Sequence, residues 1–433
     1  MNKVLIITYY WPPGSGPGVQ RFLKMSKYLK EFGWEPVILT VRNGSYPSVD
    51  KSLLEEIPEA LNVLKAKTIE PFRIYNKLSG RKGNSNSVGL IGHDKDKGIL
   101  QKISFFIRAN LFVPDARAGW RPFAIKKAKG LIYKESIDAI ITTGPPHSTH
   151  LIGLKLKQKY RLPWLADMRD PWTNIFYNKS LPRTNHTIKR DKKLENKVLK
   201  SADYITAVSP GLKKEFENRN ENINVIFNGF DEEDIPESTH QKSSKFTLSY
   251  IGNLKPNQNI QKLWEAIKDL SDTVPGFNDN FMLSLTGNYD DRIENDLIHF
   301  EISELTKVNS FVSHNQAIRL MDQSSLLLFI IPQAENNELI ITGKIFEYIA
   351  SRSPILSIGP VSGDASNILV DAGRDEMLDY IDKEGIKKNI LFYYNKWLEN
   401  AYYNFKHTSK DFKKYSRRGA SENLTKILNQ IVK

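Results

Sequence analysis

The chain has 433 residues, of which 40% are hydrophobic and 11% aromatic, and it contains no cysteine. This composition is typical of a globular protein with two or three domains, and it excludes disulfide bonds and thiolate metal sites. The formal net charge of +13 favours anionic partners, among them nucleoside diphosphates and anionic lipids.

The sequence carries no helix-turn-helix, zinc-finger or aromatic RNA-binding signature, so we expect no nucleic-acid partner. No apolar run approaches the roughly 18 residues of a membrane span. The N-terminus enters the first expected strand without a charged and then apolar leader, and we therefore expect a cytoplasmic location.

The first 41 residues predict a strand, a glycine-rich loop, a helix and a second strand. Val4–Ile7 is an apolar run typical of a strand buried on both faces. Gly14, Gly16 and Gly18 follow at alternate positions, where a ligand could approach the backbone closely. Apolar residues then recur at helical spacing, and 37–41 forms the second strand. This order predicts an anion site at the start of the helix.

A nicotinamide dinucleotide site is one interpretation of this unit. Its fingerprint requires a third glycine where Val19 stands, and an acidic residue at the end of the second strand, where Arg42 stands. Arg42 could suit a 2′-phosphate, so a dehydrogenase stays as a minor alternative. A tight turn without ligand is a further alternative.

Strands and helices alternate along most of the rest of the chain, which predicts parallel sheets with helices on both faces. Further strands are expected at 137–142, 164–167, 204–208 and 225–227, and then at 246–251, 281–285, 326–331 and 355–358. The polar stretch between Asn228 and Ser244 predicts a domain junction. We expect a first α/β domain at 1–230, joined by 415–433, and a second at 236–414.

Two segments interrupt this alternation. The stretch 76–97 is rich in Lys, Asn, Ser and Gly and predicts a surface loop; its Asp94 and Asp96 resemble a metal-binding pair but are expected to be solvated. The segment 99–112 predicts an amphipathic helix, either packed in the core or docked on an anionic membrane surface. The basic, aromatic tail 394–433 is expected to be helical and to pack across both domains.

A short helix is predicted from Gly343 to Ala350, in a crossover that leads to a strand near Pro354. Lys344 and Glu347 lie three residues apart and share one face of this helix. The cation could meet a phosphate and the carboxylate could accept hydrogen bonds from ribose hydroxyls, although a plain surface ion pair would have the same spacing.

In the first half, His147 follows one strand, and Asp167, Arg169 and Asp170 end the next. Both sets are expected at the carboxyl edge of the sheet. His147 could bind a substrate hydroxyl or phosphate, or could simply begin a helix. Asp170 could cap the backbone, whereas Asp167 and Arg169 are expected to face a cleft, since burying such charges requires partners.

Taken together, these motifs resemble the glycosyltransferases of the two-Rossmann-domain type (GT-B), in particular the large retaining family four. The resemblance runs nearly end to end and rests on Tyr9–Arg21, Gly144–His150, Trp164–Trp172, Asn228–Asp231, Tyr250–Asn253 and Lys344–Pro354. It implies two Rossmann-like domains that face a central cleft, with a C-terminal helix that crosses back to the first domain. It also implies that the first domain binds an acceptor, that the second binds a nucleotide sugar, and that no metal or other cofactor is required.

Carried over by position, the resemblance implies that Gly14, Gly16 and Gly18 approach the donor diphosphate and that His147 contacts the transferred sugar. It also implies that Glu347 holds the ribose. Catalytic roles are expected for His147, Asp167 and Arg169. The expected donor-binding residues are Gly14, Gly16, Gly18, Gly252, Asn253, Lys255, Gly343, Lys344 and Glu347.

Two positions depart from the family's pattern. The family usually has a second Glu eight residues before the ribose-binding one, where this chain has Leu339 with Glu338 beside it. It also usually has an Arg after the second domain's first glycine and a Lys a few residues on, and both neutralise diphosphate. In this chain Asn253 stands in the place of the Arg, and Lys255 or Lys262 would have to serve as the Lys.

The expected function is retaining, metal-independent transfer of a sugar from a nucleoside diphosphate sugar to a saccharide or lipid-linked hydroxyl in cell-surface polysaccharide synthesis. The leaving phosphate would accept the acceptor's proton. A peripheral contact with the anionic inner face of the cell membrane is a further expectation. The alternatives are a sugar-nucleotide epimerase on the same scaffold and a non-catalytic scaffold that binds a nucleotide sugar or membrane.

Overall fold

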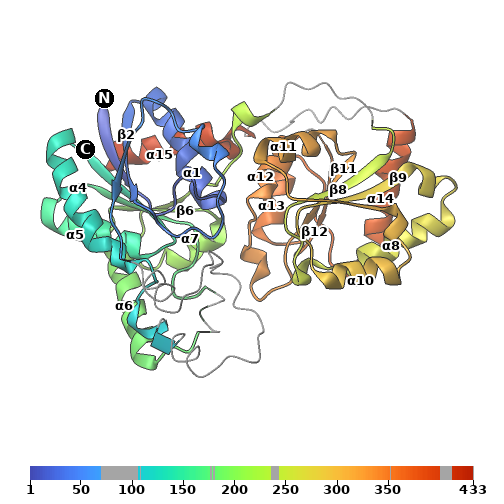
Figure 1. Cartoon of the computed structure of the whole chain (residues 1–433), viewed down its shortest axis with the longest axis horizontal. Helices are drawn as coiled ribbons and strands as arrows, with labels where there is room; N and C mark the ends of the chain where they lie inside the picture. Colours follow the sequence, from blue (N-terminus) through green and yellow to red (C-terminus); the bar gives the residue numbers. More distant parts are fainter. Residues whose placement is uncertain are drawn as a thin grey trace. The chain divides into compact units, whose positions relative to one another are not determined.

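The computed structural model describes residues 1–69, 106–107, 109–175, 178, 181–235, 243–351, 353–399 and 412–432. The chain divides into two compact units, one formed by Met1–Asn228 with Arg417–Lys433 and the other by Gly229–Ser416 (Figure 1). The expected loop at 76–97, its Asp94 and Asp96, and most of the expected helix at 99–112 lie outside the described residues.

The first unit is built on a parallel sheet with the strand order β3-β2-β1-β4-β5-β6-β7. Its strands are β1 (Asn2–Ile7), β2 (Trp34–Val41), β3 (Asn62–Ala66), β4 (Ala139–Gly144), β5 (Trp164–Met168), β6 (Tyr204–Ala207) and β7 (Ile223–Val225). Its helices are α1 (Pro17–Tyr28), α4 (Arg121–Glu135), α5 (Ser148–Tyr160), α6 (Asn185–Ser201), α7 (Pro210–Phe216) and α15 (Arg417–Ile431). The central strands are buried on both faces because helices cover each side.

The two faces of this sheet have separate apolar cores. Side chains of α4, α5, α6 and α7 pack on one face. On the other, α1 packs beside α15, which contributes Leu424, Ile427 and Leu428 (Figure 1). The expected return of the C-terminal helix to the first domain is confirmed.

The second unit repeats the architecture with the strand order β10-β9-β8-β11-β12, again parallel. Its strands are β8 (Phe246–Ile251), β9 (Phe281–Thr286), β10 (Thr306–Asn309), β11 (Leu326–Ile330) and β12 (Ile355–Ile358). Its helices are α8 (Gln261–Thr273), α9 (Phe277–Asn280), α10 (Asp291–His299), α11 (His314–Gln323), α12 (Lys344–Ala350), α13 (Asp364–Asp371) and α14 (Lys383–Leu398). The expected α/β class with two Rossmann-like sheets is confirmed.

Short 3-10 helices connect these elements. They are η1 (Leu29–Phe32), η2 (Ser52–Leu54), η3 (Ala118–Trp120), η5 (Glu232–Asp234), η6 (Pro256–Gln258), η7 (Ser303–Leu305), η8 (Asn337–Leu339) and η9 (Phe412–Tyr415). No helix among the described residues is long and apolar enough to cross a membrane.

Candidate functional site

In the second unit, the site is built on two glycines that follow neighbouring strands. Gly252 follows β8 with φ 124°, and Gly287 follows β9 with φ 115°. A Cβ atom on Gly287 would lie 2.7 Å from the carbonyl oxygen of Gly252. The backbone conformation favours glycine at both positions, and at Gly287 the contact with the backbone of Gly252 also excludes a side chain.

Lys344, the first residue of α12, lies over Gly252. Its Nζ would be 2.5 Å from a Cβ at that glycine, so the missing side chain makes room for the ammonium. Nζ donates a hydrogen bond to Tyr250 Oη at 3.0 Å, and the Tyr250 hydroxyl donates to the carbonyl of Asn253 at 3.1 Å. Burial lowers the pKa of Lys344 to about 8, an effect that Glu347 opposes and Lys255 reinforces. A poorly hydrated cation at a loop of bare backbone is suited to bind an anion.

Glu347 lies one turn after Lys344, with its side chain 20% exposed. His314, at the start of α11, stands between two carboxylates: its Nε2 is 3.2 Å from Asp234 Oδ2, and its Nδ1 is 3.9 Å from Glu347 Oε1. His314 could not be recognised from the sequence, because it lies 33 positions before Glu347 and belongs to no recognisable motif.

Helix α12 is fixed in place by buried contacts. Its Tyr348 hydroxyl accepts a hydrogen bond from the backbone N–H of Ile251 at 3.3 Å. At its C-terminal end, the Arg374 guanidinium donates to the carbonyls of Ile349 and Ser351 at 2.5 and 2.6 Å. These bonds satisfy carbonyls that a helix end leaves unpaired, and they position Lys344 at the edge of the sheet.

The other expected donor-binding residues of this unit lie around that edge. Asn253 and Lys255 are exposed, and Gly343 precedes α12 with helical backbone angles. Leu339 is 43% exposed and sits with Glu338 in η8. Gly252, Lys344 and Glu347 are thus brought together.

In the first unit, the structure corrects the expected placement of Asp167. Its side chain is 1% exposed and does not face a cleft. It accepts hydrogen bonds from Arg21 at 2.7 Å, from Thr143 at 2.7 Å and from Thr206 at 2.7 Å. Burial raises the pKa of Asp167, but Arg21 and the two hydroxyls outweigh this effect, and the pKa lies below its usual value. A carboxylate with all these partners is a structural ion pair with no access to substrate.

Arg169 explains the glycine at position 18. A Cβ on Gly18 would lie 1.7 Å from its Nη1, so the guanidinium packs on the backbone of α1. Arg169 also donates hydrogen bonds to the carbonyls of Gly144, at 3.2 Å, and of Pro145. We expected a diphosphate to approach the backbone at Gly18. In the structure the Arg169 guanidinium occupies that space.

The other two glycines of the opening loop differ from each other. A Cβ on Gly14 would collide with the Tyr46 ring, at 2.6 Å from Cδ1, so this position also serves internal packing. Gly16 precedes α1 with φ 102° and has no neighbouring atom within 4 Å of a Cβ. Among the described residues, none fills the space beside Gly16, so of the three glycines only this one leaves its backbone open to a ligand.

His147 lies immediately before α5 and is 7% exposed. Its ring stacks on Trp172 at 4.9 Å with an angle of 7° between the planes. Burial, then His150 and Arg169, hold the pKa of His147 well below its usual value, against a smaller opposite effect of the Pro171 carbonyl. The ring is therefore neutral at neutral pH and can both donate and accept a hydrogen bond.

Two neighbours of His147 have shifted pKa values as well. Burial lowers the pKa of His150 to about 3; its Nδ1 lies 2.9 Å from Thr142 Oγ1. Burial raises the pKa of Asp170 to about 6, although Arg169 opposes this change. Asp170 thus titrates close to neutral pH, as residues in functional sites often do.

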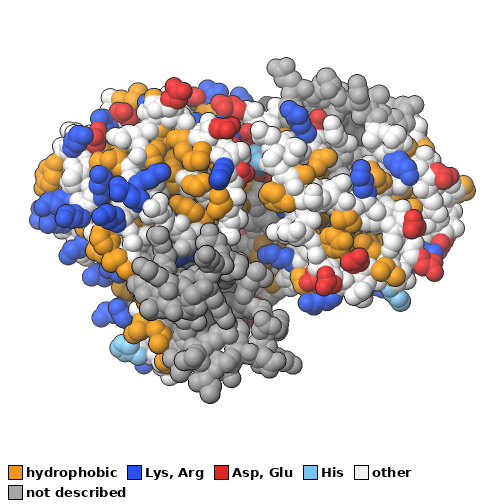
Figure 2. All heavy atoms as spheres, viewed as in Figure 1, with side chains coloured by type: hydrophobic (Ala, Val, Ile, Leu, Met, Phe, Trp, Pro, Cys, Tyr) orange, Lys and Arg blue, Asp and Glu red, His pale blue; other side chains and the backbone are white. Residues whose placement is uncertain are grey.

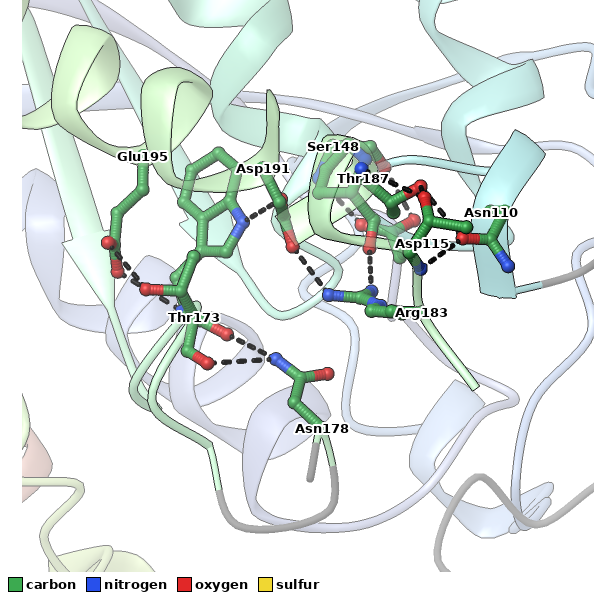
Figure 3. Close-up of polar contacts among 12 residues, drawn as sticks. Asn110, Asp115, Ser148, Thr173, Asn178, Arg183, Thr187, Asp191 and Glu195 are labelled. Carbon is green, nitrogen blue, oxygen red and sulfur yellow. Dashed lines mark hydrogen bonds and ion pairs between the residues drawn. The ribbon is translucent and has the colours of Figure 1, made fainter. Parts of the chain in front are cut away.

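The loop that carries Trp172 is held by the inward face of α6 (Figure 3). Trp172 Nε1 donates to Asp191 at 2.8 Å, and Arg183 donates to the other oxygen of this carboxylate at 2.7 Å. One turn further along α6, Glu195 accepts hydrogen bonds from the backbone and the hydroxyl of Thr173 at 3.2 and 2.8 Å. These contacts fix the ring on which His147 stacks.

A second anchor holds the start of α5. Asp115 accepts hydrogen bonds from the Ser148 backbone N–H at 2.8 Å and from its hydroxyl at 2.9 Å (Figure 3). Burial raises the pKa of Asp115 in spite of these bonds. Polar contacts therefore fix the two elements on either side of His147, the start of α5 and the loop that carries Trp172. No group of three His, Cys, Asp or Glu side chains that could hold a metal ion occurs in the described ranges.

Residues 88–234 match the model of the protein family described as Glycosyltransferase Family 4. This match contains His147, Asp167, Arg169 and Asp170 and covers about a third of the chain. No curated protein sequence matches the chain significantly.

Solved structures match over the whole length at low sequence identity. Sucrose-phosphate synthase from Thermosynechococcus elongatus is 12% identical, with a TM-score of 0.60 and 99% of each chain covered. A mutant of S. aureus TarM in complex with Fondaparinux, alpha-GlcNAc-glycerol and UDP is 10% identical, with a TM-score of 0.57 and 100% of each chain covered. UDP-GlcNAc 2-epimerase from Methanocaldococcus jannaschii is 13% identical, with a TM-score of 0.53, and the match covers 99% of this chain and 100% of that one. At these identities the likeness establishes the fold.

Proposed function

Because the chain has the GT-B fold, and because part of its first unit matches glycosyltransferase family four, we propose that it transfers a sugar from a nucleoside diphosphate sugar to a hydroxyl of a saccharide or lipid-linked acceptor. The observation that carries this proposal is the grouping of Gly252, Lys344 and Glu347 at the carboxyl edge of the second sheet. Nucleotides bind at this edge in open α/β sheets.

Each residue of this group has a role in the proposed reaction. Bond cleavage leaves negative charge on the departing diphosphate, and the Lys344 ammonium would stabilise this charge. Lys344 lies over the glycine that precedes Asn253, and so supplies a cation where the family usually has an Arg. The Glu347 carboxylate would accept hydrogen bonds from the two ribose hydroxyls.

In the first unit, neutral His147 would hydrogen-bond a hydroxyl of the transferred sugar. Retention of configuration would require no strong protein base, since the leaving phosphate can accept the acceptor's proton. This agrees with the absence of a free carboxylate at Asp167. We further propose that the acceptor belongs to cell-surface polysaccharide synthesis, on the strength of the family resemblance.

Binding of nucleoside diphosphates and their sugars, measured by calorimetry on the full chain, tests the proposal. We expect one nucleotide class to bind, and Glu347→Gln to weaken it about 10- to 100-fold, as for loss of a hydrogen bond to a charged group. Glu384→Gln, an exposed residue of α14, is the matched control and should bind as the parent does. Failure of every nucleotide to bind, or equal affinity of the two variants, would overturn the proposal.

A sugar-nucleotide epimerase is the second candidate, and the fold shared with UDP-GlcNAc 2-epimerase favours it. The epimerase would interconvert the bound sugar nucleotide without an acceptor and without release of nucleoside diphosphate. A glycosyltransferase would release diphosphate in proportion to acceptor consumed. A scaffold that binds donor without turnover is the third possibility, which Leu339 in place of the usual Glu favours.

A further inference from the structure

His314 lies in the second unit, at the same edge of the sheet as Glu347. Strand β10 ends at Asn309, and helix α11 begins at His314. The Ser313 hydroxyl accepts a hydrogen bond from the Gln316 backbone N–H at 3.4 Å, and the Gln316 side chain accepts one from the Ser313 backbone N–H at 3.1 Å. This capping box fixes the first turn of α11, and with it the point from which the imidazole extends.

The imidazole of His314 lies between two carboxylates from distant parts of the chain. Its Nε2 is 3.2 Å from Oδ2 of Asp234 in η5, and its Nδ1 is 3.9 Å from Oε1 of Glu347 in α12. Because a carboxylate only accepts hydrogen bonds, Nε2 donates to Asp234, and this bond sets the orientation of the ring. The imidazolium form donates from both nitrogens and can pair with both carboxylates at once. The three side chains are 16 to 20% exposed, so these contacts are partly shielded from water.

The contact with His314 restricts a side chain that is flexible by itself. Glu347 has three rotatable side-chain bonds, and fixing them in one rotamer when a ligand binds costs conformational entropy. The imidazole is rigid and comes from another helix, so it limits the positions of the Glu347 carboxylate before a ligand arrives. A carboxylate that is already in place binds a ligand more tightly, because less freedom is lost on binding.

Lys344, on the same helix as Glu347, is directed elsewhere. Its ammonium donates a hydrogen bond to the Tyr250 hydroxyl at 3.0 Å and acts on Glu347 through its charge. On the face of the second unit that Figure 2 shows, the described Lys, Arg, Asp and Glu side chains are interspersed. A broad field of one sign therefore does not orient a nucleotide on this face, and its position depends on local contacts such as that of His314.

We propose that His314 is a positioning residue, which holds the Glu347 carboxylate where it accepts hydrogen bonds from both ribose hydroxyls while Asp234 holds the ring. This inference rests on the proposed function and adds a substrate class to it. A carboxylate fixed for two neighbouring hydroxyls selects donors whose nucleoside carries the 2′-hydroxyl, because a 2′-deoxynucleoside leaves one of these hydrogen bonds unmade.

Calorimetry on the full chain tests this selection with UDP, GDP, CDP and ADP, each beside its 2′-deoxy counterpart. For the nucleotide that binds the parent most tightly, we expect the 2′-deoxy form to bind about 10- to 100-fold more weakly, as for loss of one hydrogen bond to a charged group. His314→Phe keeps an aromatic ring but removes both nitrogens. It should weaken the ribonucleotide about tenfold and the 2′-deoxy form by less than about threefold, because the second form has only one hydroxyl to lose.

Three further variants separate positioning from a structural role. His314→Asn, whose amide N–H can replace that of Nδ1, should recover much of the ribonucleotide affinity. Asp234→Ala should weaken the ribonucleotide less than His314→Phe does, and should add nothing when combined with it, because Asp234 acts through the ring. His299→Phe, at an exposed histidine of α10, is the matched control and should bind as the parent does. Circular dichroism should show the same fold for all of them.

The inference is overturned if His314→Phe weakens both forms equally, since a structural or purely electrostatic role would have that effect. It is also overturned if the parent binds both forms alike. If Glu347→Gln weakens the nucleotide while His314→Phe and His299→Phe both bind as the parent does, the inference fails and the proposed function stands. A parent that binds none of these nucleotides would contradict both.

Discussion

At the level of single residues, the burial of Lys344 controls its charge, and this charge is the group that we propose to bind the donor's diphosphate. Burial lowers the pKa of its ammonium to about 8, so a growing fraction of the free protein loses this charge as pH rises through that value. If the ammonium binds diphosphate, donor affinity should be nearly constant below about pH 7 and about tenfold weaker at pH 9 than at pH 7. Calorimetric titration of a nucleotide sugar over this range measures the effect.

Lys344→Arg provides the control for this titration, because a guanidinium stays protonated throughout the range. Its affinity, even if lower, should not change between pH 7 and pH 9. A parent protein whose affinity is equally constant would show that Lys344 does not bind the donor's phosphates.

Asp167 and Arg21 form a buried ion pair, and breaking it should lower the free energy of unfolding substantially. Asp167→Asn leaves the Arg21 guanidinium buried without its counter-charge, and we expect unfolding free energy to fall by about 3–5 kcal/mol. Because the pKa of Asp167 is lowered in the folded protein, its contribution is present near neutral pH and is lost on acidification. Urea unfolding followed by tryptophan fluorescence measures the change. Glu301→Gln, in an exposed ion pair, should alter stability by less than about 1 kcal/mol.

The sequence allowed part of this residue-level picture to be predicted. Lys344 and Glu347 share a helix, so their spacing alone places them together. His314 reaches Glu347 only through the tertiary fold, and local patterns do not show such a contact. Asp167 was expected to face a cleft because no partner for its charge was evident in the sequence. Its partner, Arg21, lies 146 positions away, and no local pattern links the two residues.

At the element scale, the central strands were predicted because both of their faces are buried and their sequences are continuous apolar runs. The strands β3 and β10 were missed. Each lies at an edge of its sheet and is partly exposed, so its sequence lacks such a run. Missing these two strands did not affect the prediction of the candidate site in the second unit, because the loops that carry Gly252 and Gly287 follow the central strands β8 and β9.

The helix α15 completes the core of a unit whose other elements precede it by almost 200 residues. Leu428 is fully buried against this core, and Trp34 donates a hydrogen bond to Asn429 at 2.8 Å. Leu428→Ala should therefore destabilise the first unit by about 2–5 kcal/mol. The same substitution at Leu398, 47% exposed in α14, should have less than half this effect. Urea unfolding compares the two variants, and equal effects would contradict the role given to α15.

At the scale of the whole molecule, the two units differ in chain continuity. The second is one continuous segment, Gly229–Ser416, with its own apolar core and with Gly252, Lys344 and Glu347. The first is made of two segments, and removal of Arg417–Lys433 would expose the apolar residues that α15 covers.

This difference predicts different behaviour of the isolated parts. A fragment of residues 229–416 should fold cooperatively and bind the same nucleotide as the full chain, because every contact described for Lys344 and Glu347 lies within it. A fragment of residues 1–228 should be less stable than the same segment fused through a flexible linker to 417–433. Helix α1 alone covers only part of the second face of the sheet, and the fusion restores the apolar contacts of α15 beside it. Thermal unfolding of the three fragments and calorimetry of the first test these statements. If the fragment 229–416 folds but binds no nucleotide that the full chain binds, residues of the first unit must contribute directly to donor affinity, and Lys344 and Glu347 would be insufficient for it.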